Sequence, residues 1–191
     1  MTDLGGGRVE VICGPMFSGK SEELIRRVRR ATIAQQRVQV FKPLMDNRYA
    51  LNEVMSHNKV SASAVSVKDA MEIIDIVKST FDPEVVGIDE AQFLGDGLAA
   101  ACNLMANEGR RVIVAGLDMD FTGAPFANMS ALLCRSESVT KLSAVCMVCG
   151  AEASRTYRKS AGKEQIQIGG EKEYEARCRK CHINGELNQG N

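Results

Sequence analysis

The chain has 191 residues, enough for one full α/β core and a small appendage but too few for two large domains. Its 24 basic side chains are balanced by 24 acidic ones, so net charge gives no indication of nucleic-acid binding. No apolar run approaches the roughly 20 residues needed to cross a bilayer, and the first residues lack the layout of a signal peptide. We therefore expect a cytoplasmic protein that binds neither nucleic acid nor membrane.

Four short runs rich in β-branched residues predict buried strands, at residues 8–13, 37–41, 84–88 and 111–115. The second is expected to stop at Lys42-Pro43, because proline cannot continue a central ladder. Apolar residues at helical spacing predict helices over residues 19–36, 68–79 and 97–107, whereas residues 44–66 are polar and predict irregular structure. The alternation of strand and helix predicts a parallel sheet with covering helices.

After about residue 142 the apolar runs become short and two cysteine pairs enter a charged segment. This change predicts a separate small domain. We expect a nucleotide-binding α/β domain over residues 1–141 and a second domain over residues 142–191.

A phosphate-binding motif lies between the first predicted strand and the first predicted helix. Residues 14–21 (GPMFSGKS) fit G-x-x-x-x-G-K-[ST] without a gap. Backbone N–H groups of such a loop converge on phosphate oxygens, Lys20 reaches the β and γ oxygens, and Ser21 ligates Mg²⁺. The agreement of loop and flanking elements favours a nucleoside triphosphate site over an incidental Gly-rich turn.

An acidic pair, Asp89 and Glu90, directly follows the third predicted strand. A P-loop site needs a carboxylate there, so Asp89 is expected to hold the Mg²⁺ shell. Glu90 is suited to accept a proton from an attacking hydroxyl. Two alternatives stay open: Glu90 is a surface carboxylate at a turn, or the pair belongs to an ATPase in which the glutamate orients water.

Four of the seven cysteines form two C-x-x-C pairs, Cys146/Cys149 and Cys178/Cys181, and four thiolates are the ligands of a structural Zn²⁺ site. His182 is the alternative fourth ligand. A redox dithiol is disfavoured because neither pair is expected to open a helix in a thioredoxin-like βαβ unit. Four protein ligands leave no open position, so the metal should clamp the loop over residues 150–177 at both ends.

Seven segments, in order along nearly the whole chain, resemble the zinc-containing type of the thymidine kinase family. They are residues 14–21 (GPMFSGKS), 46–49 (DNRY), 87–93 (GIDEAQF), 115–121 (AGLDMDF), 125–126 (PF), 141–149 (KLSAVCMVC) and 168–181 (IGGEKEYEARCRKC).

The resemblance implies a P-loop, RecA-like α/β fold with a small C-terminal zinc-binding domain that carries a lasso loop. It implies transfer of the ATP γ-phosphate to the 5′-hydroxyl of thymidine or deoxyuridine, in nucleotide salvage and DNA synthesis. It also implies a homotetramer and makes feedback inhibition by dTTP plausible.

The resemblance also assigns roles residue by residue, with Glu90 matching the general base. The positions that match the family's ATP and Mg²⁺ contacts are Gly14, Pro15, Met16, Phe17, Ser18, Gly19, Lys20, Ser21, Asp46, Asn47, Arg48, Asp89 and Gln92. Those that match its nucleoside contacts are Met16, Phe93, Leu117, Phe121, Thr156 and Tyr174, with the lasso backbone of Gln165, Ile166, Gln167, Ile168 and Gly169. The metal ligands are Cys146, Cys149, Cys178 and Cys181. Without the resemblance, ordinary core packing is the preferred interpretation of Phe93, Leu117 and Phe121.

The chain departs from the family pattern at Asn58, where the family usually has aspartate, and at Glu22, where threonine is frequent. Glu22 in a first helical turn suits the helix dipole. Two other function classes stay open: a nucleic-acid-stimulated ATPase, and a zinc-ribbon binding module with a regulatory nucleotide switch. The arginines of the first helix favour a solvated face over a nucleic-acid surface.

Overall fold

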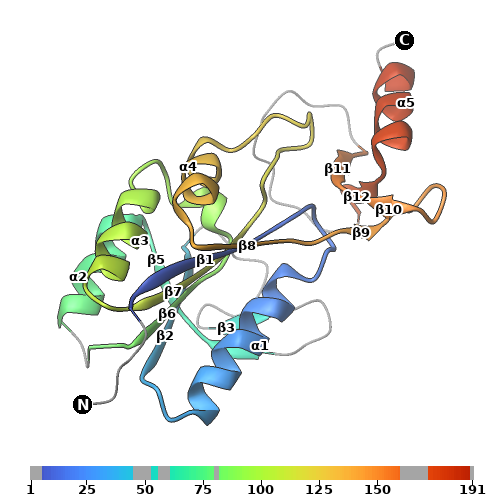
Figure 1. Cartoon of the computed structure of the whole chain (residues 1–191). Coiled ribbons are helices and arrows are strands. Elements are labelled where there is room, and N and C mark those ends of the chain that lie inside the picture. The colour runs from blue at the N-terminus through green and yellow to red at the C-terminus, as the bar shows by residue number, and fades with distance from the viewer. Residues whose placement is uncertain (1–5, 45–52, 56–60, 80–81, 160–171, 190–191) are drawn as a thin grey trace.

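The chain folds around a six-stranded, all-parallel sheet (Figure 1). The structure is a computed structural model and describes residues 6–44, 53–55, 61–79, 82–159 and 172–189. The strand order is β5-β2-β6-β7-β1-β8. The strands are β1 (Arg8–Cys13), β2 (Val38–Pro43), β5 (Val65–Val67), β6 (Val85–Ile88), β7 (Arg111–Gly116) and β8 (Ser138–Lys141).

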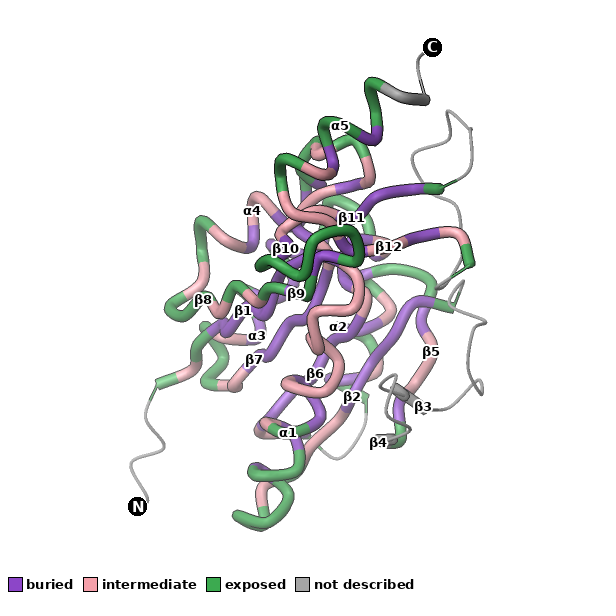
Figure 2. The backbone as a smooth tube through the Cα atoms, turned by 90° about the vertical axis from the view of Figure 1, so that its right-hand side faces the viewer, coloured by how far each residue is buried: buried purple, intermediate pink, exposed green. Residues whose placement is uncertain are grey.

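Helices cover both faces of this sheet, which confirms the predicted α/β fold. Helix α1 (Lys20–Ile33) packs on one face, whereas α2 (Ala70–Ser79), α3 (Leu98–Asn107) and α4 (Ala127–Arg135) pack on the other. Strand β1 shows why both faces are buried: Val9 and Val11 join the core under α2, α3 and α4, whereas Ile12 joins the core under α1. The central strands are accordingly buried in Figure 2.

The predicted elements are largely confirmed, and local chemistry explains the boundaries. Helix α2 begins at Ala70, because the Asp69 carboxylate accepts the N–H groups of Met71 (2.9 Å) and Glu72 (3.0 Å). The Glu72 carboxylate accepts the N–H of Lys68 in return, at 2.7 Å. These bonds resemble a capping box, except that Glu72 accepts the N–H of Lys68, one residue before the cap residue Asp69, and they lie directly after the strand that ends at Val67.

The expectation that the second strand stops before Pro43 is wrong, since β2 includes Pro43, paired with Val67. The C=O of Phe41 accepts the N–H of Asp89, on the β6 side, at 2.9 Å. Backbone groups two residues apart on a strand point to the same side, so the nitrogen of Pro43 faces the β6 side as well. Pairing with β6 has already ended there, so the missing N–H breaks no ladder bond.

The expectation of irregular structure over residues 44–66 is also wrong where the structure describes them. Strands β3 (Glu53–Met55) and β4 (Ser61–Ser63) form an antiparallel hairpin, and β5 pairs with β2 at the edge of the main sheet. Each of these strands is three residues long, too short to give a periodic signal.

A smaller unit follows β8. It contains β9 (Ala144–Val145), β10 (Glu152–Ala153), β11 (Arg155–Arg158), β12 (Tyr174–Arg177) and α5 (Arg179–Gln189). Ala144, Cys146, Ala153 and Ala176 form its buried core, against which Phe17 of the P-loop packs. The division of the chain into two domains at residue 141 stays a prediction.

Among the helices in the described ranges, none has the length and apolar character needed to span a bilayer.

Candidate active site

Charged side chains gather where four neighbouring strands end. Strand β1 leads into the P-loop and Lys20, β6 leads into Asp89 and Glu90, and β7 leads into Asp118. Strand β8 ends at Lys141, whose Nζ lies 2.7 Å from Asp118 Oδ2. Because parallel strands end at the same edge of a sheet, residues far apart in sequence form one cluster.

The P-loop is held in shape by its own backbone. Gly14 has φ +142°, and a Cβ there would lie 2.3 Å from the C=O of Leu142, so only glycine fits. The Lys20 ammonium donates to the C=O of Pro15 at 2.7 Å, and the Ser18 hydroxyl donates to the same oxygen at 2.8 Å. Lys20 therefore curls back over the loop.

The acidic pair lies beside Lys20. Burial lowers the pKa of Lys20, whereas the negative charges of Glu90, Asp89 and Asp118 act in the opposite direction. The strand-to-turn bend is sharp: Glu90 adopts a left-handed conformation (φ 48°), and its N–H donates to Asp89 Oδ1 at 2.9 Å. The bend opens the short 3₁₀ turn η1 (Ala91–Phe93). The structure thus brings together the two halves of the site that the sequence predicts.

Asp89 is buried and its pKa is raised to about 7. Burial is the main cause, and the Glu90 charge adds to it. A hydrogen bond from the Ser21 hydroxyl, the Glu90 N–H and the Lys20 charge oppose the rise. A carboxylate and a hydroxyl in contact are hard oxygen donors, so Ser21 and Asp89 fit a Mg²⁺ shell.

Asp118 is the acidic residue that the sequence analysis missed. It is buried at 5% exposure and faces Lys20 together with Asp89 and Glu90. The sequence does contain a signal for Asp118, because this residue closely follows a buried strand, as Asp89 does. Within the segment AGLDMDF, the family resemblance assigns roles to Leu117 and Phe121 but not to Asp118.

The residues that the resemblance assigns to the nucleoside lie around this edge. The N–H of Met16 donates to Thr156 Oγ1 at 3.0 Å, which joins the P-loop to β11. The N–H of Leu117 donates to Gln92 Oε1 at 2.9 Å, which joins the β7 end to η1. Met16, Leu117 and Phe93 are half-buried.

Phe121 and Tyr174 complete the described part of this set. The guanidinium of Arg158 lies 3.6 Å above the centre of the Phe121 ring. Tyr174 is buried on β12, opposite Arg158 in the hairpin with β11. The remaining predicted contacts lie outside the described residues: Asp46, Asn47 and Arg48, and the lasso residues Gln165, Ile166, Gln167, Ile168 and Gly169.

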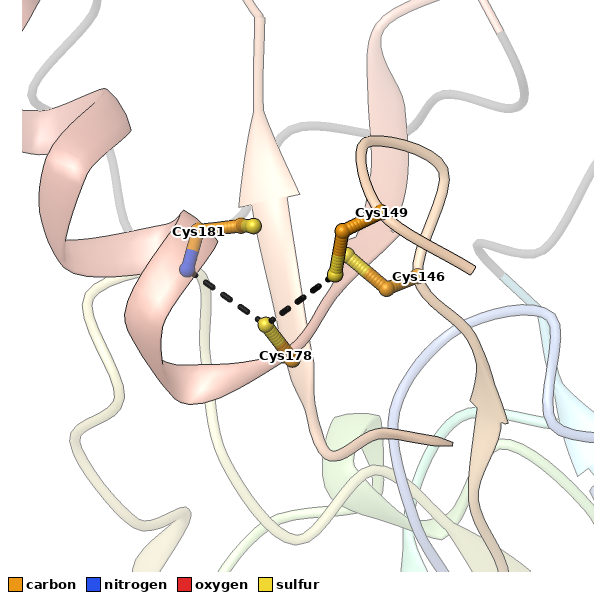
Figure 3. A group of neighbouring side chains, drawn as sticks. All are labelled: Cys146, Cys149, Cys178 and Cys181. Atoms are coloured by element: carbon orange, nitrogen blue, oxygen red, sulfur yellow. Dashed lines mark hydrogen bonds between the residues drawn. The ribbon is translucent and has the colours of Figure 1, made fainter. Parts of the chain in front are cut away.

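The four predicted zinc ligands converge (Figure 3). The Sγ atoms of Cys146, Cys149, Cys178 and Cys181 all lie within 4.8 Å of one another, and those of Cys149 and Cys178 are 3.8 Å apart. Zn–S bonds of about 2.3 Å in a tetrahedron place two sulfurs roughly 3.8 Å apart, so the cluster fits a structural zinc ion.

The alternative ligand, His182, is directed elsewhere. Its Nε2 lies 2.7 Å from the C=O of Phe121, and its Nδ1 lies 3.7 Å from a carboxylate oxygen of Glu186. The second cysteine pair lies at the start of a helix, since α5 begins directly after Cys178. That helix follows an antiparallel hairpin rather than a βαβ unit, so the redox interpretation gains no support.

The family model described as thymidine kinase matches residues 7–182. The match spans both the P-loop and the four-cysteine cluster. It covers most of the 191 residues, so it applies to the chain as a whole. The chain therefore belongs to the thymidine kinase family and is an ATP-dependent phosphotransferase.

Proposed function

We propose that this chain transfers the γ-phosphate of ATP to the 5′-hydroxyl of thymidine, giving dTMP, and that it accepts deoxyuridine as well. The product places it in pyrimidine deoxynucleotide salvage for DNA synthesis. The observation that carries the proposal is the electrostatic interaction between the P-loop lysine and the acidic pair, within a chain of this family.

In this proposal Glu90 is the general base and Lys20 stabilises negative charge on the transferring group. Glu90 lies at the end of β6, near enough to Lys20 for their charges to interact. A hydroxyl held between them meets a proton acceptor on one side and a cation near the phosphate on the other. Mg²⁺ would be held by Ser21 and Asp89 and, when bound with ATP, neutralises phosphate charge.

We propose that the nucleoside lies between the P-loop and the β11–β12 hairpin. Met16, Phe93, Leu117 and Phe121 would pack on it, with Thr156 and Tyr174 from the hairpin side. Apolar and aromatic neighbours give shape and stacking, whereas the lasso backbone over residues 165–169 would read the pyrimidine edge. The hydrogen bond between Met16 and Thr156 supports this arrangement, because it joins the two sides.

Three further parts of the proposal concern the molecule as a whole. The P-loop domain would end at residue 141, the zinc ion would hold the base of the lasso segment, and the active form would be a homotetramer that dTTP inhibits. The convergence of four thiols supports the zinc ion.

Transfer of labelled γ-phosphate tests the proposed reaction. Purified protein is incubated with γ-labelled ATP, Mg²⁺ and a panel of nucleosides, and the label is followed into nucleotide and free phosphate. We expect label on thymidine and deoxyuridine. Label only as free phosphate would favour an ATPase and contradict the proposal.

Replacing the proposed base tests the mechanism. Glu90→Gln keeps the size of the side chain but removes its basicity, so kcat should fall by about 10²-fold or more. The Kd for ATP should stay within about threefold, because Glu90 is not assigned to ATP. Glu108→Gln, an exposed change of the same kind, is the matched control. Unchanged kcat in Glu90→Gln would remove Glu90 from the mechanism.

A further inference from the structure

The side chain of Gln92 bridges two parts of the candidate active site. Its Nε2 donates to Glu90 Oε2 at 2.5 Å, and its Oε1 accepts the N–H of Leu117 at 2.9 Å. Gln92 lies in η1 and is only 5% exposed. One buried amide thus connects the turn after β6 with the end of β7.

The chemistry of the partners fixes which way the amide points. The two ends of a glutamine amide differ only in that nitrogen donates and oxygen accepts. The N–H of Leu117 can only donate, so it requires the amide oxygen. The amide nitrogen is then left for Glu90, whose ionised carboxylate can only accept. A reversed amide would break both bonds.

The surroundings leave the Gln92 side chain little room to move. A Cβ on Gly116 would lie 3.0 Å from Gln92 Oε1 and 2.9 Å from Met129 Sδ, so glycine at this position makes space for both. Asn128 of α4 also fixes η1, the turn that contains Gln92, since its Nδ2 donates to the C=O of Ala91 at 2.9 Å. Both Asn128 and Met129 are buried.

The backbone of Glu90 explains why such a clamp is needed. Glu90 is in a left-handed conformation, which a non-glycine residue adopts only when its surroundings hold it there. Its carboxylate also lies next to the carboxylate of Asp89, and the two groups repel each other when both are charged. The short hydrogen bond from Gln92 counters both the backbone strain at Glu90 and the repulsion from Asp89, because it holds one oxygen of the Glu90 carboxylate in a fixed position.

We propose that Gln92 is a positioning residue that holds the Glu90 carboxylate in its reactive orientation and ties it to Leu117. The inference rests on the proposed role of Glu90 as general base. It assigns to Gln92 a contact with the base in place of the ATP contact that the family resemblance implies. Gln92 then affects turnover through Glu90 and has no direct part in binding ATP.

Gln92→Glu tests this role, because it keeps the shape but replaces the amide donor by a carboxyl. We expect kcat to fall by about 10- to 100-fold, with KM for ATP and thymidine changed by less than about threefold. The acid limb of the pH profile of kcat should move to higher pH, because two adjacent carboxyls share a proton. Gln36→Glu, a partly exposed change after α1, is the matched control.

A double-mutant cycle separates positioning from a merely structural role. In a Glu90→Gln background the base is already absent, so adding Gln92→Glu should lower kcat by less than about threefold further. An equal loss in both backgrounds would overturn the proposal. A raised KM for ATP with unchanged kcat would also overturn it and return Gln92 to ATP binding.

Gln92→Met gives a readout that needs no turnover. Methionine keeps the volume without adding a buried charge, so the variant remains informative if Gln92→Glu does not fold. Loss of the Gln92 acceptor should speed hydrogen exchange at the Leu117 N–H by about tenfold, relative to wild type. Unchanged exchange would overturn the clamp. Failure of wild-type protein to phosphorylate thymidine would instead contradict the proposed function and leave this exchange result standing.

Discussion

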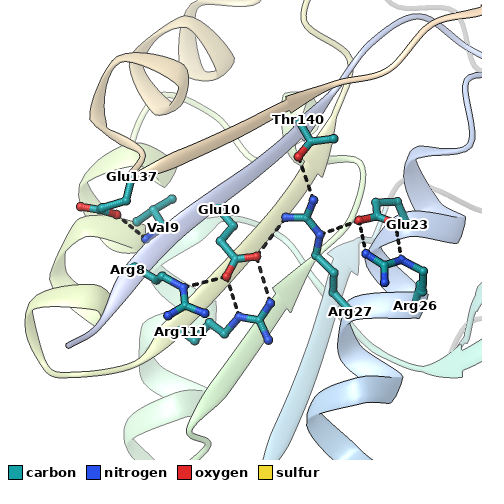
Figure 4. Close-up of polar contacts among 9 residues, drawn as sticks. All are labelled: Arg8, Val9, Glu10, Glu23, Arg26, Arg27, Arg111, Glu137 and Thr140. Atoms are coloured by element: carbon teal, nitrogen blue, oxygen red, sulfur yellow. Dashed lines mark hydrogen bonds and ion pairs between the residues drawn. The ribbon is translucent and has the colours of Figure 1, made fainter. Parts of the chain in front are cut away.

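At the two ends of the sheet, the surroundings shift the pKa of a buried carboxyl group in opposite directions. At the amino ends of β1 and β7, Glu10 lies among Arg8, Arg27 and Arg111 (Figure 4). Burial by itself raises the pKa of Glu10, but hydrogen bonds and charge from Arg111 and Arg8 lower it to about 2. At the carboxyl ends, burial and the Glu90 charge raise the pKa of Asp89 to about 7.

The difference shows which end stabilises the fold and which end carries the chemistry. Arg8 and Arg111 face each other directly across β1 and β7, and like charges in that position repel. The Glu10 carboxylate lies between them and removes the repulsion, so its charge favours folding. At the carboxyl ends, Asp89, Glu90 and Asp118 all interact with the buried Lys20, and Asp118 also pairs with Lys141 at 2.7 Å. The raised pKa of Asp89 is the kind of perturbation that is typical of a functional site.

The largest expected effect comes from removing that lysine. Lys20→Met should lower kcat by about 10³-fold, since a cation that stabilises the transferring phosphate is lost. The free energy of unfolding at pH 7 should change by less than about 1 kcal/mol, because Asp89 can take up a proton in place of the lost cation. Steady-state kinetics and urea unfolding measure the two quantities. A loss of several kcal/mol would make Lys20 a structural residue and break the contrast between the two ends.

The matched change at the other end is Glu10→Gln, which should act on stability alone. The lowering of the Glu10 pKa from 4.5 to about 2 corresponds to about 3 kcal/mol of stability at pH 7. We expect urea unfolding to show a loss of that order, with kcat unchanged, because Glu10 lies in the amino-terminal half of β1, whereas the P-loop follows the carboxyl end of that strand. A fall in kcat in the folded variant would contradict the division of roles.

The pH dependence of unfolding sharpens the same point. A carboxyl whose folded pKa is lowered contributes its full stability above the unfolded pKa of about 4.5 and loses it as pH falls towards 2. Wild type and Glu10→Gln should therefore differ by about 3 kcal/mol at pH 7 and converge as pH falls from 4.5 to 2. A constant difference down to pH 2 would mean that Glu10 acts through packing alone.

Motifs that are local in sequence could be predicted, because a run of adjacent residues carries their signal. The P-loop, the acidic pair and the two cysteine pairs are of this kind. Strand β8 was missed because it is an edge strand with mostly exposed residues and no apolar run. Helix α4, at nine residues, is too short for its spacing to stand out.

Contacts that depend on strand order could not be predicted in the same way. Asp118 faces Lys20, and Gln92 reaches Leu117, only because β7 lies between β6 and β1. No single segment of the sequence determines the order of parallel strands or the direction in which a side chain points. The arginines of α1 show the same limit: Arg27 was expected on a solvated face, but it is only 12% exposed and pairs with Glu10.

The smallest expected effect tests a link between the cysteine cluster and the nucleoside side of the site. A C=O can only accept, so His182 Nε2 carries the proton in its 2.7 Å bond to Phe121. If Phe121 packs on the nucleoside, His182→Ala should raise KM for thymidine by about fivefold, or about 1 kcal/mol, and leave KM for ATP unchanged.

Metal analysis separates this link from loss of the cluster itself. His182→Ala should keep its zinc, because the four sulfurs that converge do not include His182, whereas Cys181→Ser should lose it. Loss of zinc from His182→Ala, with zinc kept in Cys181→Ser, would make His182 the fourth ligand. An unchanged KM for thymidine with zinc bound would confine His182 to holding α5 against the loop after β7. The cysteine cluster would then stabilise the chain, as Glu10 does, without reaching the chemistry.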